Sequence, residues 1–370
     1  MTLRIAIEAR CGNARGGTLH VHGLAVPTPL FMPVGTLGSV KAMAPDEVRA
    51  NGTRVILGNT FHLLQRPGLD VLERLGGLHR FMGWDGAILT DSGGYQVFSL
   101  AERRKVDDDG VTFASPLDGS RVLLTPASVV EAQGKIGSDI AMVLDECPPA
   151  QAPRPAVEEA VRRTTRWAKL ALAAPRREGQ ALFGIVQGAL DVPLRLAHLE
   201  ELAALPFDGL ALGGFSVGET PERRTPVLGE VAPQMPEDRP RYLMGLGTPG
   251  DLFDAVRAGI DMFDCVLPTR NARNGQAFTA QGRITIKQAR FREDPEPLEP
   301  GCPCPACRRF SRAYLRHLFV CGEVLSSRLL TAHNLSFYER WMAKLRAAVR
   351  DGTLDSLEPE ARAATAAFGT

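Results

Sequence analysis

Short apolar segments alternate with longer amphipathic segments along most of the chain. Near-continuous apolar runs of this kind predict parallel strands that are buried on both faces and separated by helices. Thr248-Pro249 also has the residue types of a helix N-cap and first turn. Helices are predicted at 153–174, 192–205, 222–232 and 249–258, and strands at 29–34, 54–57, 87–90, 140–144, 181–186, 210–212, 241–244 and 262–266.

Eight strand–helix units predict an α/β fold, a (β/α)8 TIM barrel, with a doubly wound sheet as the alternative. The first 25 residues read as a small β cap, and 106–124 as an inserted hairpin that turns at Asp118-Gly119. Prolines and cysteines gather after residue 295, ahead of helical segments at 310–320 and 335–350. We therefore expect a barrel domain over 1–294 and a zinc-binding helical subdomain over 295–370.

The composition is that of a soluble globular protein, with 44% hydrophobic and 23% charged residues in a chain of 370. A net charge of +1 excludes a protein that coats nucleic acid by bulk charge. The charge is nevertheless uneven, because 261–350 holds 15 basic and 8 acidic residues, a net of +7 against −6 elsewhere. Arg308, Arg312 and Arg316 are spaced to share one helix face, which suits RNA, although a solvated arginine face is the plainer alternative.

No targeting segment is visible, and the longest stretch without a charged side chain, 16–40, contains three prolines. These features predict a cytoplasmic protein. Seven cysteines, three of them at Cys302, Cys304 and Cys307, favour a reducing compartment and a metal site over disulfides. Three thiolates and one imidazole would make a closed, structural Zn²⁺ shell, and His333, His317 and Cys321 are the candidates for the fourth ligand.

Polar or glycine residues follow the predicted strands directly. Each aspartate taken alone could be a helix N-cap. The C-terminal ends of barrel strands converge on one mouth, however, and would bring these residues together. Burying several carboxylates side by side costs folding free energy unless they bind a ligand. The positions are Asn59, Asp91, Asp145, Glu146, Gln187, Gly213-Gly214, Gly245 and Asp264.

Several long motifs resemble the bacterial tRNA-guanine transglycosylases, from about residue 5 to residue 350. Cys302, Cys304, Cys307 and His333 match the zinc site of that family in type and spacing. The other motifs are Asp91-Ser92-Gly93-Gly94-Tyr95-Gln96-Val97-Phe98-Ser99-Leu100, Leu144-Asp145-Glu146-Cys147, Ile185-Val186-Gln187-Gly188, Gly213-Gly214-Phe215-Ser216-Val217-Gly218-Glu219 and Phe263-Asp264-Cys265-Val266-Leu267-Pro268-Thr269-Arg270.

The resemblance implies an enzyme of queuosine biosynthesis that exchanges the wobble guanine of certain tRNAs for 7-aminomethyl-7-deazaguanine. Asp264 would be the nucleophile that holds the ribose covalently, and Asp91 the general acid and base. Arg270 and Arg273 would position the RNA of the anticodon loop, and the family is homodimeric. The implied base-binding residues are Ser92, Tyr95, Asp145, Cys147, Gln187, Gly213, Gly214, Phe215, Glu219 and Met244.

Cys147, Val217 and Glu219 match the bacterial enzymes, which take 7-aminomethyl-7-deazaguanine, whereas the eukaryotic enzymes take queuine. Phe215 departs from the bacterial pattern, because bacterial members commonly have leucine there, and its larger ring is expected to reshape that side of the pocket.

Three other interpretations compete with this one. A non-catalytic partner subunit would bind RNA without chemistry, but both Asp91 and Asp264 are present. A metal-dependent hydrolase is suggested by His20-x-His22, yet this pair precedes the first barrel strand and reads as cap histidines. An archaeal enzyme that acts on the tRNA D-loop would carry an extra RNA-binding domain after residue 350.

Overall fold

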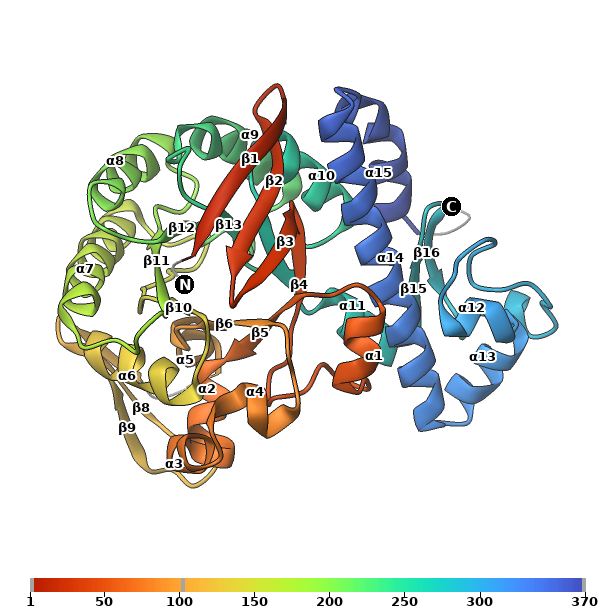
Figure 1. Ribbon diagram of the computed structural model, residues 1–370, viewed down its shortest axis with the longest axis horizontal. Helices are drawn as coiled ribbons and strands as arrows, with labels where there is room; N and C mark the ends of the chain where they lie inside the picture. Colours follow the sequence, from red (N-terminus) through yellow and green to blue (C-terminus); the bar gives the residue numbers. More distant parts are fainter. Residues whose placement is uncertain (1–2, 101–103, 368–370) are drawn as a thin grey trace.

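The computed structural model describes residues 3–100 and 104–367 (Figure 1). Its largest sheet has eight strands, all parallel, in the order β4-β14-β13-β12-β11-β10-β6-β5. A parallel bridge between Val34 and Leu57 joins the two edge strands and closes the barrel. The predicted strands are confirmed as β4 (Leu30–Pro33), β5 (Val55–Asn59), β6 (Ala87–Asp91), β10 (Ile140–Met142), β11 (Ala181–Val186), β12 (Gly209–Leu212), β13 (Arg241–Leu243) and β14 (Met262–Cys265).

Helices follow the barrel strands, and the four predicted before residue 295 lie within two residues of their expected bounds. Of the two predicted after it, 310–320 is a helix over Arg312–Val320, whereas 335–350 is the C-terminal part of a longer helix, Val324–Arg350. Thr248 caps its helix as expected, since its Oγ1 accepts from the Asp251 N–H at 3.1 Å and Pro249 takes the first turn. The helices of the barrel are α1 (Pro45–Ala50), α2 (Thr60–Leu63), η1 (Leu64–Gly68), α3 (Leu69–Arg74), α4 (Gly77–Met82), α5 (Gly94–Leu100), α6 (Pro126–Ile136), α7 (Arg154–Ala173), α8 (Val192–Ala203), α9 (Pro221–Val231), η2 (Ala232–Gln234), α10 (Pro249–Arg257) and α11 (Leu267–Arg273).

The predicted β cap is an antiparallel sheet of three strands, β1 (Arg4–Cys11), β2 (Ala14–Val21) and β3 (Leu24–Thr28). The predicted hairpin at 106–124 is instead a second three-stranded sheet, formed by β7 (Arg104–Asp107), β8 (Gly110–Ala114) and β9 (Arg121–Leu124). The turn at Asp118-Gly119 lies where it was expected, between β8 and β9. The extra strand was missed because Arg104–Asp107 contains a single apolar residue and therefore shows no alternation.

Most of the remaining elements form a lobe beside the barrel, and the long helix α14 runs between the two (Figure 1). A separate small core fills this lobe with side chains from both sides of residue 295, from Ala272 to Leu330. Helix α14 also packs against β1 and β2 of the cap and against β4 and α10 of the barrel. The elements after α11 are β15 (Gln276–Thr279), β16 (Gly282–Thr285), η3 (Ala289–Phe291), α12 (Pro305–Arg309), α13 (Arg312–Val320), α14 (Val324–Arg350), η4 (Leu354–Leu357) and α15 (Glu358–Thr365). The last two return to the barrel, because their buried side chains belong to its core and α15 packs on α10.

The expected arginine face does not form. Arg308 lies on α12, whereas Arg312 and Arg316 lie on α13, because the chain leaves the helix at Phe310 and Ser311 caps the next one. Arg312 is largely buried and pairs with Asp294 at 3.1 Å. Among the described elements, no helix is both long and apolar enough to cross a membrane.

A buried ion pair fastens the β cap to the barrel. Both Arg15 on β2 and Asp261, directly before β14, have no exposed side-chain surface. The guanidinium donates to both carboxylate oxygens at 2.9 Å, and its other contacts are the carbonyls of Glu237 and Arg239. The Arg241 N–H also donates to Asp261 at 2.8 Å. All these partners lie near the N-terminal ends of the strands, so the pair holds the end of the barrel opposite to the mouth.

We expect Asp261→Ala to lower the free energy of unfolding by about 3–5 kcal/mol, because it leaves the Arg15 charge buried without a partner. Urea unfolding followed by circular dichroism measures this change. The matched control is Arg10→Ala, which removes an exposed ion pair with Glu237 and should cost less than about 1 kcal/mol. Equal effects of the two variants would contradict the role given to Arg15 and Asp261.

Candidate functional site

The C-terminal ends of the barrel strands surround a cavity of about 320 Å³. Three aspartates from β6, β14 and the segment after β10 line it: Asp91, Asp264 and Asp145. Among the described residues none of the three carboxylates belongs to an ion pair, and each is held by uncharged donors only. The cavity is also lined by Ser92, Tyr95, Cys147, Gln187, Gly213, Gly214, Val217, Met244 and Arg270.

Asp91 ends β6 and is almost fully buried. Its Oδ2 accepts from the side-chain amides of Asn59 and Gln96, and its Oδ1 accepts from the Thr60 N–H at 2.9 Å. The pKa of Asp91 is raised to about 6, chiefly by burial and to a smaller extent by the charge of Asp264, against the lowering effect of these hydrogen bonds. A carboxyl group with this pKa can both give and take a proton near neutrality.

Asp264 lies on β14 and faces the same cavity. The Tyr242 hydroxyl donates to its Oδ1 at 2.6 Å, and the Gly245 N–H donates to the same oxygen at 2.8 Å. Burial raises the pKa of Asp264, while these two hydrogen bonds act in the opposite direction. Because both donors contact Oδ1, the described residues leave Oδ2 without a hydrogen bond and available to a ligand.

Asp145 is connected to Gln187 on the neighbouring strand end. The Gln187 Nε2 donates to Asp145 Oδ2 at 2.7 Å, and the Ser92 hydroxyl donates to Oδ1 at 3.3 Å. Burial raises the pKa of Asp145 to about 6 despite both contacts. Gln187 is itself held by His198, whose Nδ1 accepts from the Gln187 backbone N–H at 3.0 Å. The imidazole is neutral, since burial lowers the pKa of His198 to about 4.

The loop after β12 owes its position to a buried arginine. Arg195 on α8 donates to the carbonyls of Gly213 and Gly214 at 2.8 and 3.2 Å. A side chain on either glycine would collide with the Gln187 amide, and Gly214 has a φ of +68°. The Phe215 ring is fully buried beneath Arg195, 3.9 Å from the guanidinium carbon. The ring packs behind the loop and does not line the cavity, so the expected reshaping of the cavity wall stays a prediction that would act through the position of this loop.

Of the other residues expected to bind the base, some line the cavity and one lies behind its wall. Tyr95 on α5 is half-exposed and Met244 follows β13, and both line the cavity. Cys147 also lines it, and burial raises the pKa of this thiol to about 12, so it stays protonated. Glu219 is buried behind the wall, where its Oε2 accepts from the Val217 N–H at 2.8 Å.

The two arginines expected to bind RNA lie on α11, directly after the β14 aspartate. Arg270 is exposed and lines the cavity. Arg273 is exposed one turn further along, and its guanidinium donates to the Thr269 carbonyl at 2.9 Å. Both positive charges therefore lie on the solvent side of the site.

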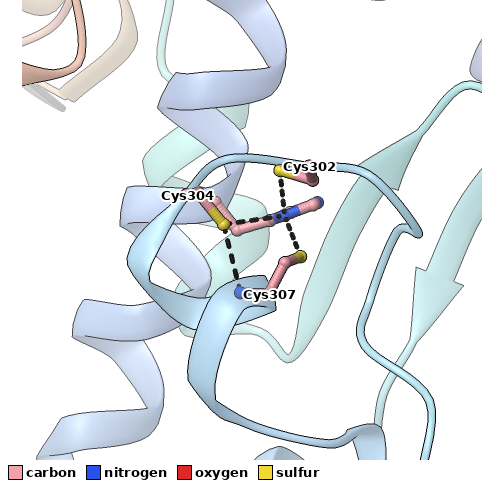
Figure 2. A group of neighbouring side chains, drawn as sticks. Cys302, Cys304 and Cys307 are labelled. Atoms are coloured by element: carbon pink, nitrogen blue, oxygen red, sulfur yellow. Dashed lines mark hydrogen bonds between the residues drawn. The ribbon is translucent and has the colours of Figure 1, made fainter.

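Four residues of the lobe converge in a cluster whose side chains could hold a metal ion, and the three cysteines of this cluster are labelled in Figure 2. The sulfur atoms of Cys302, Cys304 and Cys307 lie 3.7, 3.5 and 3.3 Å from Nδ1 of His333. The ligand atoms of a tetrahedral zinc site, with Zn–S near 2.3 Å and Zn–N near 2.1 Å, would be about 3.6 Å apart. The spacing therefore fits a closed Cys3His shell.

His333 is oriented for this role by its second ring nitrogen. Its Nε2–H donates to the Phe278 carbonyl at 2.7 Å, which leaves the Nδ1 lone pair directed at the three sulfur atoms. His333 is fully buried on α14. The alternative ligands His317 and Cys321 contact each other at 3.7 Å instead and do not belong to the cluster.

Several residues that support the site carried no recognisable signal in the sequence. Tyr242 stands within a predicted strand and reads as a core aromatic residue. Arg195 and His198 stand within a predicted helix, where only the three-dimensional structure brings them under the loop. Gln96 belongs to a recognised motif, but its contact with Asp91 is a tertiary one.

Comparison with known proteins identifies the family of this chain. The family model described as queuine tRNA-ribosyltransferase matches residues 10–366. A protein of Sorangium cellulosum (strain So ce56) named queuine tRNA-ribosyltransferase is 60% identical over 93% of this chain and 87% of its own length. Proteins with the same name from Solidesulfovibrio magneticus and Novosphingobium aromaticivorans are 53% and 52% identical, over 95% and 94% of this chain and the same shares of their own. The chain therefore belongs to the queuine tRNA-ribosyltransferase family.

Proposed function

We propose that this enzyme exchanges the wobble guanine of queuosine-type tRNAs for 7-aminomethyl-7-deazaguanine through a covalent ribosyl-aspartate intermediate. The observation that carries the proposal is the pair of buried carboxylates, Asp91 and Asp264, that face one cavity with different hydrogen-bond partners. Breaking a glycosidic bond with retention requires a nucleophilic carboxylate and a second carboxyl group that transfers protons. The names of the similar proteins point to the same class of reaction.

In the first half of the reaction, Oδ2 of Asp264 attacks C1′ of the ribose while the bond from C1′ to guanine breaks. Tyr242 and the Gly245 N–H hold the carboxylate through Oδ1. Asp91 gives its proton to the departing guanine and becomes a carboxylate. Extrusion of the base from the anticodon loop must precede these steps.

In the second half, Asp91 takes a proton from the incoming base, which attacks C1′ and displaces Asp264. The proton returns to the residue that released it, so the enzyme is regenerated. The raised pKa of Asp91 suits both directions, because neither protonation state is strongly disfavoured near neutrality.

The cavity offers a complementary group for each edge of a guanine-like base. Ionised Asp145 accepts from the base N1–H and exocyclic amine, whereas Gln187 and the Gly214 N–H donate to O6 and, in guanine, to N7. Gln187 has one amide hydrogen left for this, since the other is given to Asp145. Tyr95 and Met244 would stack on the two faces of the base.

The cysteine cluster is proposed to hold one structural Zn²⁺ ion. Three thiolates and an imidazole fill a tetrahedral shell, so the ion would stabilise the fold and take no part in the exchange. We further propose a cytoplasmic homodimer that binds the tRNA anticodon loop, with Arg270 and Arg273 next to the neighbouring phosphates.

A non-catalytic RNA-binding subunit is the second candidate. Such a protein has no need to bury uncompensated carboxylates, which destabilise the fold at neutral pH. Asp91, Asp145 and Asp264 are all kept in that costly state, and this favours the enzyme.

Asp264→Asn should lower incorporation of labelled guanine into a queuosine-type tRNA by about 10⁴-fold or more, because it removes the nucleophile. Denaturing gel electrophoresis should show an RNA–protein adduct with the wild type and none with the variant. Tyr242→Phe is the matched control, since it removes only a donor to Asp264 and should slow the exchange while preserving the adduct. Undiminished incorporation by Asp264→Asn would refute the assignment.

Asp145→Asn should make the protein more stable at pH 7 while abolishing guanine exchange. The pKa of Asp145 is higher in the folded state, so its ionisation lowers the stability of the fold as the pH rises from about 4 to 6. A shift of about two pKa units corresponds to about 3 kcal/mol at pH 7. Urea unfolding at pH 4 and pH 7 measures the difference between variant and wild type, which should be present only at pH 7. A difference of the same size at both values would contradict the linkage.

Cys304→Ser should purify with less than one equivalent of zinc, because a hydroxyl is a poor ligand in a thiolate shell. Cys321→Ser is the control and should retain the metal, as Cys321 lies outside the cluster. Metal analysis of both proteins decides the matter, and full zinc retention by Cys304→Ser would overturn the assignment.

A further inference from the structure

A second group of potential metal ligands lies at the opposite end of the barrel. His22 occupies the turn between β2 and β3, His79 lies on α4, and Asp139 directly precedes β10. Their ligand atoms all lie within 4.8 Å of one another. Because Asp139 stands at the start of its strand, this group is separated from the cavity by the length of the barrel core.

The carboxylate is fixed by the barrel itself. The Asp139 N–H donates to the Ile88 carbonyl at 2.9 Å, and its carbonyl accepts from the Ala181 N–H at 2.9 Å. Its Oδ2 accepts from the Ile88 N–H at 2.8 Å. Asp139 is therefore held between β6 and β11 and forms a rigid base for the two histidines.

The two imidazoles present nitrogen atoms to this one carboxylate. Their rings are stacked, with centroids 4.5 Å apart and planes inclined by 10°. His22 Nδ1 donates to Asp139 Oδ1 at 2.7 Å. His79 Nε2 lies 3.0 Å from Oδ2 but out of line for a hydrogen bond, so this buried nitrogen has no such partner among the described residues.

A metal ion would explain why both imidazoles face one carboxylate although only His22 forms a hydrogen bond with it. Two imidazole nitrogens and one carboxylate oxygen suit divalent ions of the first transition row, including Zn²⁺ and Co²⁺. A hollow of about 270 Å³ adjoins His22 and Asp139 and gives room for water to complete the coordination. The ion would take the place of the proton on His22 Nδ1, which is released to solvent or moves to Nε2.

We propose that His22, His79 and Asp139 bind one divalent transition-metal ion, separate from the Cys3His cluster. The site connects the β cap, through His22, to a barrel helix and to the start of a barrel strand. Metal binding would therefore stabilise the attachment of the cap, at the end of the barrel where stability rather than chemistry is expected.

The test uses the full-length protein with the metal of its cysteine cluster in place. Equilibrium dialysis against Co²⁺, followed by metal analysis, should show one equivalent per chain beyond the metal of the cluster. The added Co²⁺ should give visible d–d bands without an intense thiolate charge-transfer band, since its ligands are nitrogen and oxygen. His22→Asn, which tolerates the positive φ of 52°, and His79→Gln should each lose the added equivalent.

His20→Asn is the matched control, because this neighbouring histidine of β2 contacts Arg4 and lies outside the group. It should bind the added Co²⁺ as the wild type does. Guanine exchange should be unchanged in all three variants, and Zn²⁺ should raise the unfolding temperature of the wild type and of His20→Asn only. A wild type that takes up no added ion overturns the proposal, as does uptake that persists in both His22→Asn and His79→Gln.

Discussion

Closure of the parallel barrel is the constraint on which the rest of the molecule depends. Its last connection is short, a single bridge between Val34 and Leu57. Since all eight strands run in the same direction, closure brings every C-terminal strand end to one rim, and residues separated by more than 170 positions in the chain, such as Asp91 and Asp264, come to line one cavity. The same closure buries them, and this burial is the main cause of their raised pKa values.

Buried carboxylates are paired with a cation at one end of the barrel and held by neutral donors at the other. At the start of β14, Asp261 is paired with Arg15, so neither of these two buried charges is left without a partner. Three residues later, Asp264 is held by a phenol and a backbone N–H and has no cation beside it among the described residues. In the proposed reaction, a cation at this position would hold the carboxylate ionised and weaken it as a nucleophile. Neutral donors fix the geometry of Asp264 and leave its reactivity largely intact.

The sequence was most informative where the residues that suit a local element are also the residues that its place in the fold requires. The eight strands were predictable because each is buried on both faces and therefore continuously apolar, and Thr248-Pro249 marked a helix start. The cysteine motif similarly identified its own cluster, whereas the fourth ligand was ambiguous until α14 brought His333 to it. Strand β7 was not predicted, because it forms by pairing with β8 and its own composition shows no strand pattern. The role of Arg195 was not predicted, because a buried arginine is recognisable only from the carbonyls that surround it.

Helix α14 links the Cys3His cluster to the rim of the barrel that carries Asp264. It carries His333, and one residue later the Asn334 amide donates to the Pro268 carbonyl in α11, the helix that follows Asp264. One turn further on, the Tyr338 hydroxyl donates to the carbonyl of Gly247, in the loop after β13. Under the proposed zinc assignment, a cell that is short of zinc would lose alignment of carboxylates that never touch the ion. The extent of tRNA modification would then depend on the zinc supply of the cell, although the two aspartates proposed to carry out the exchange are not ligands of the ion.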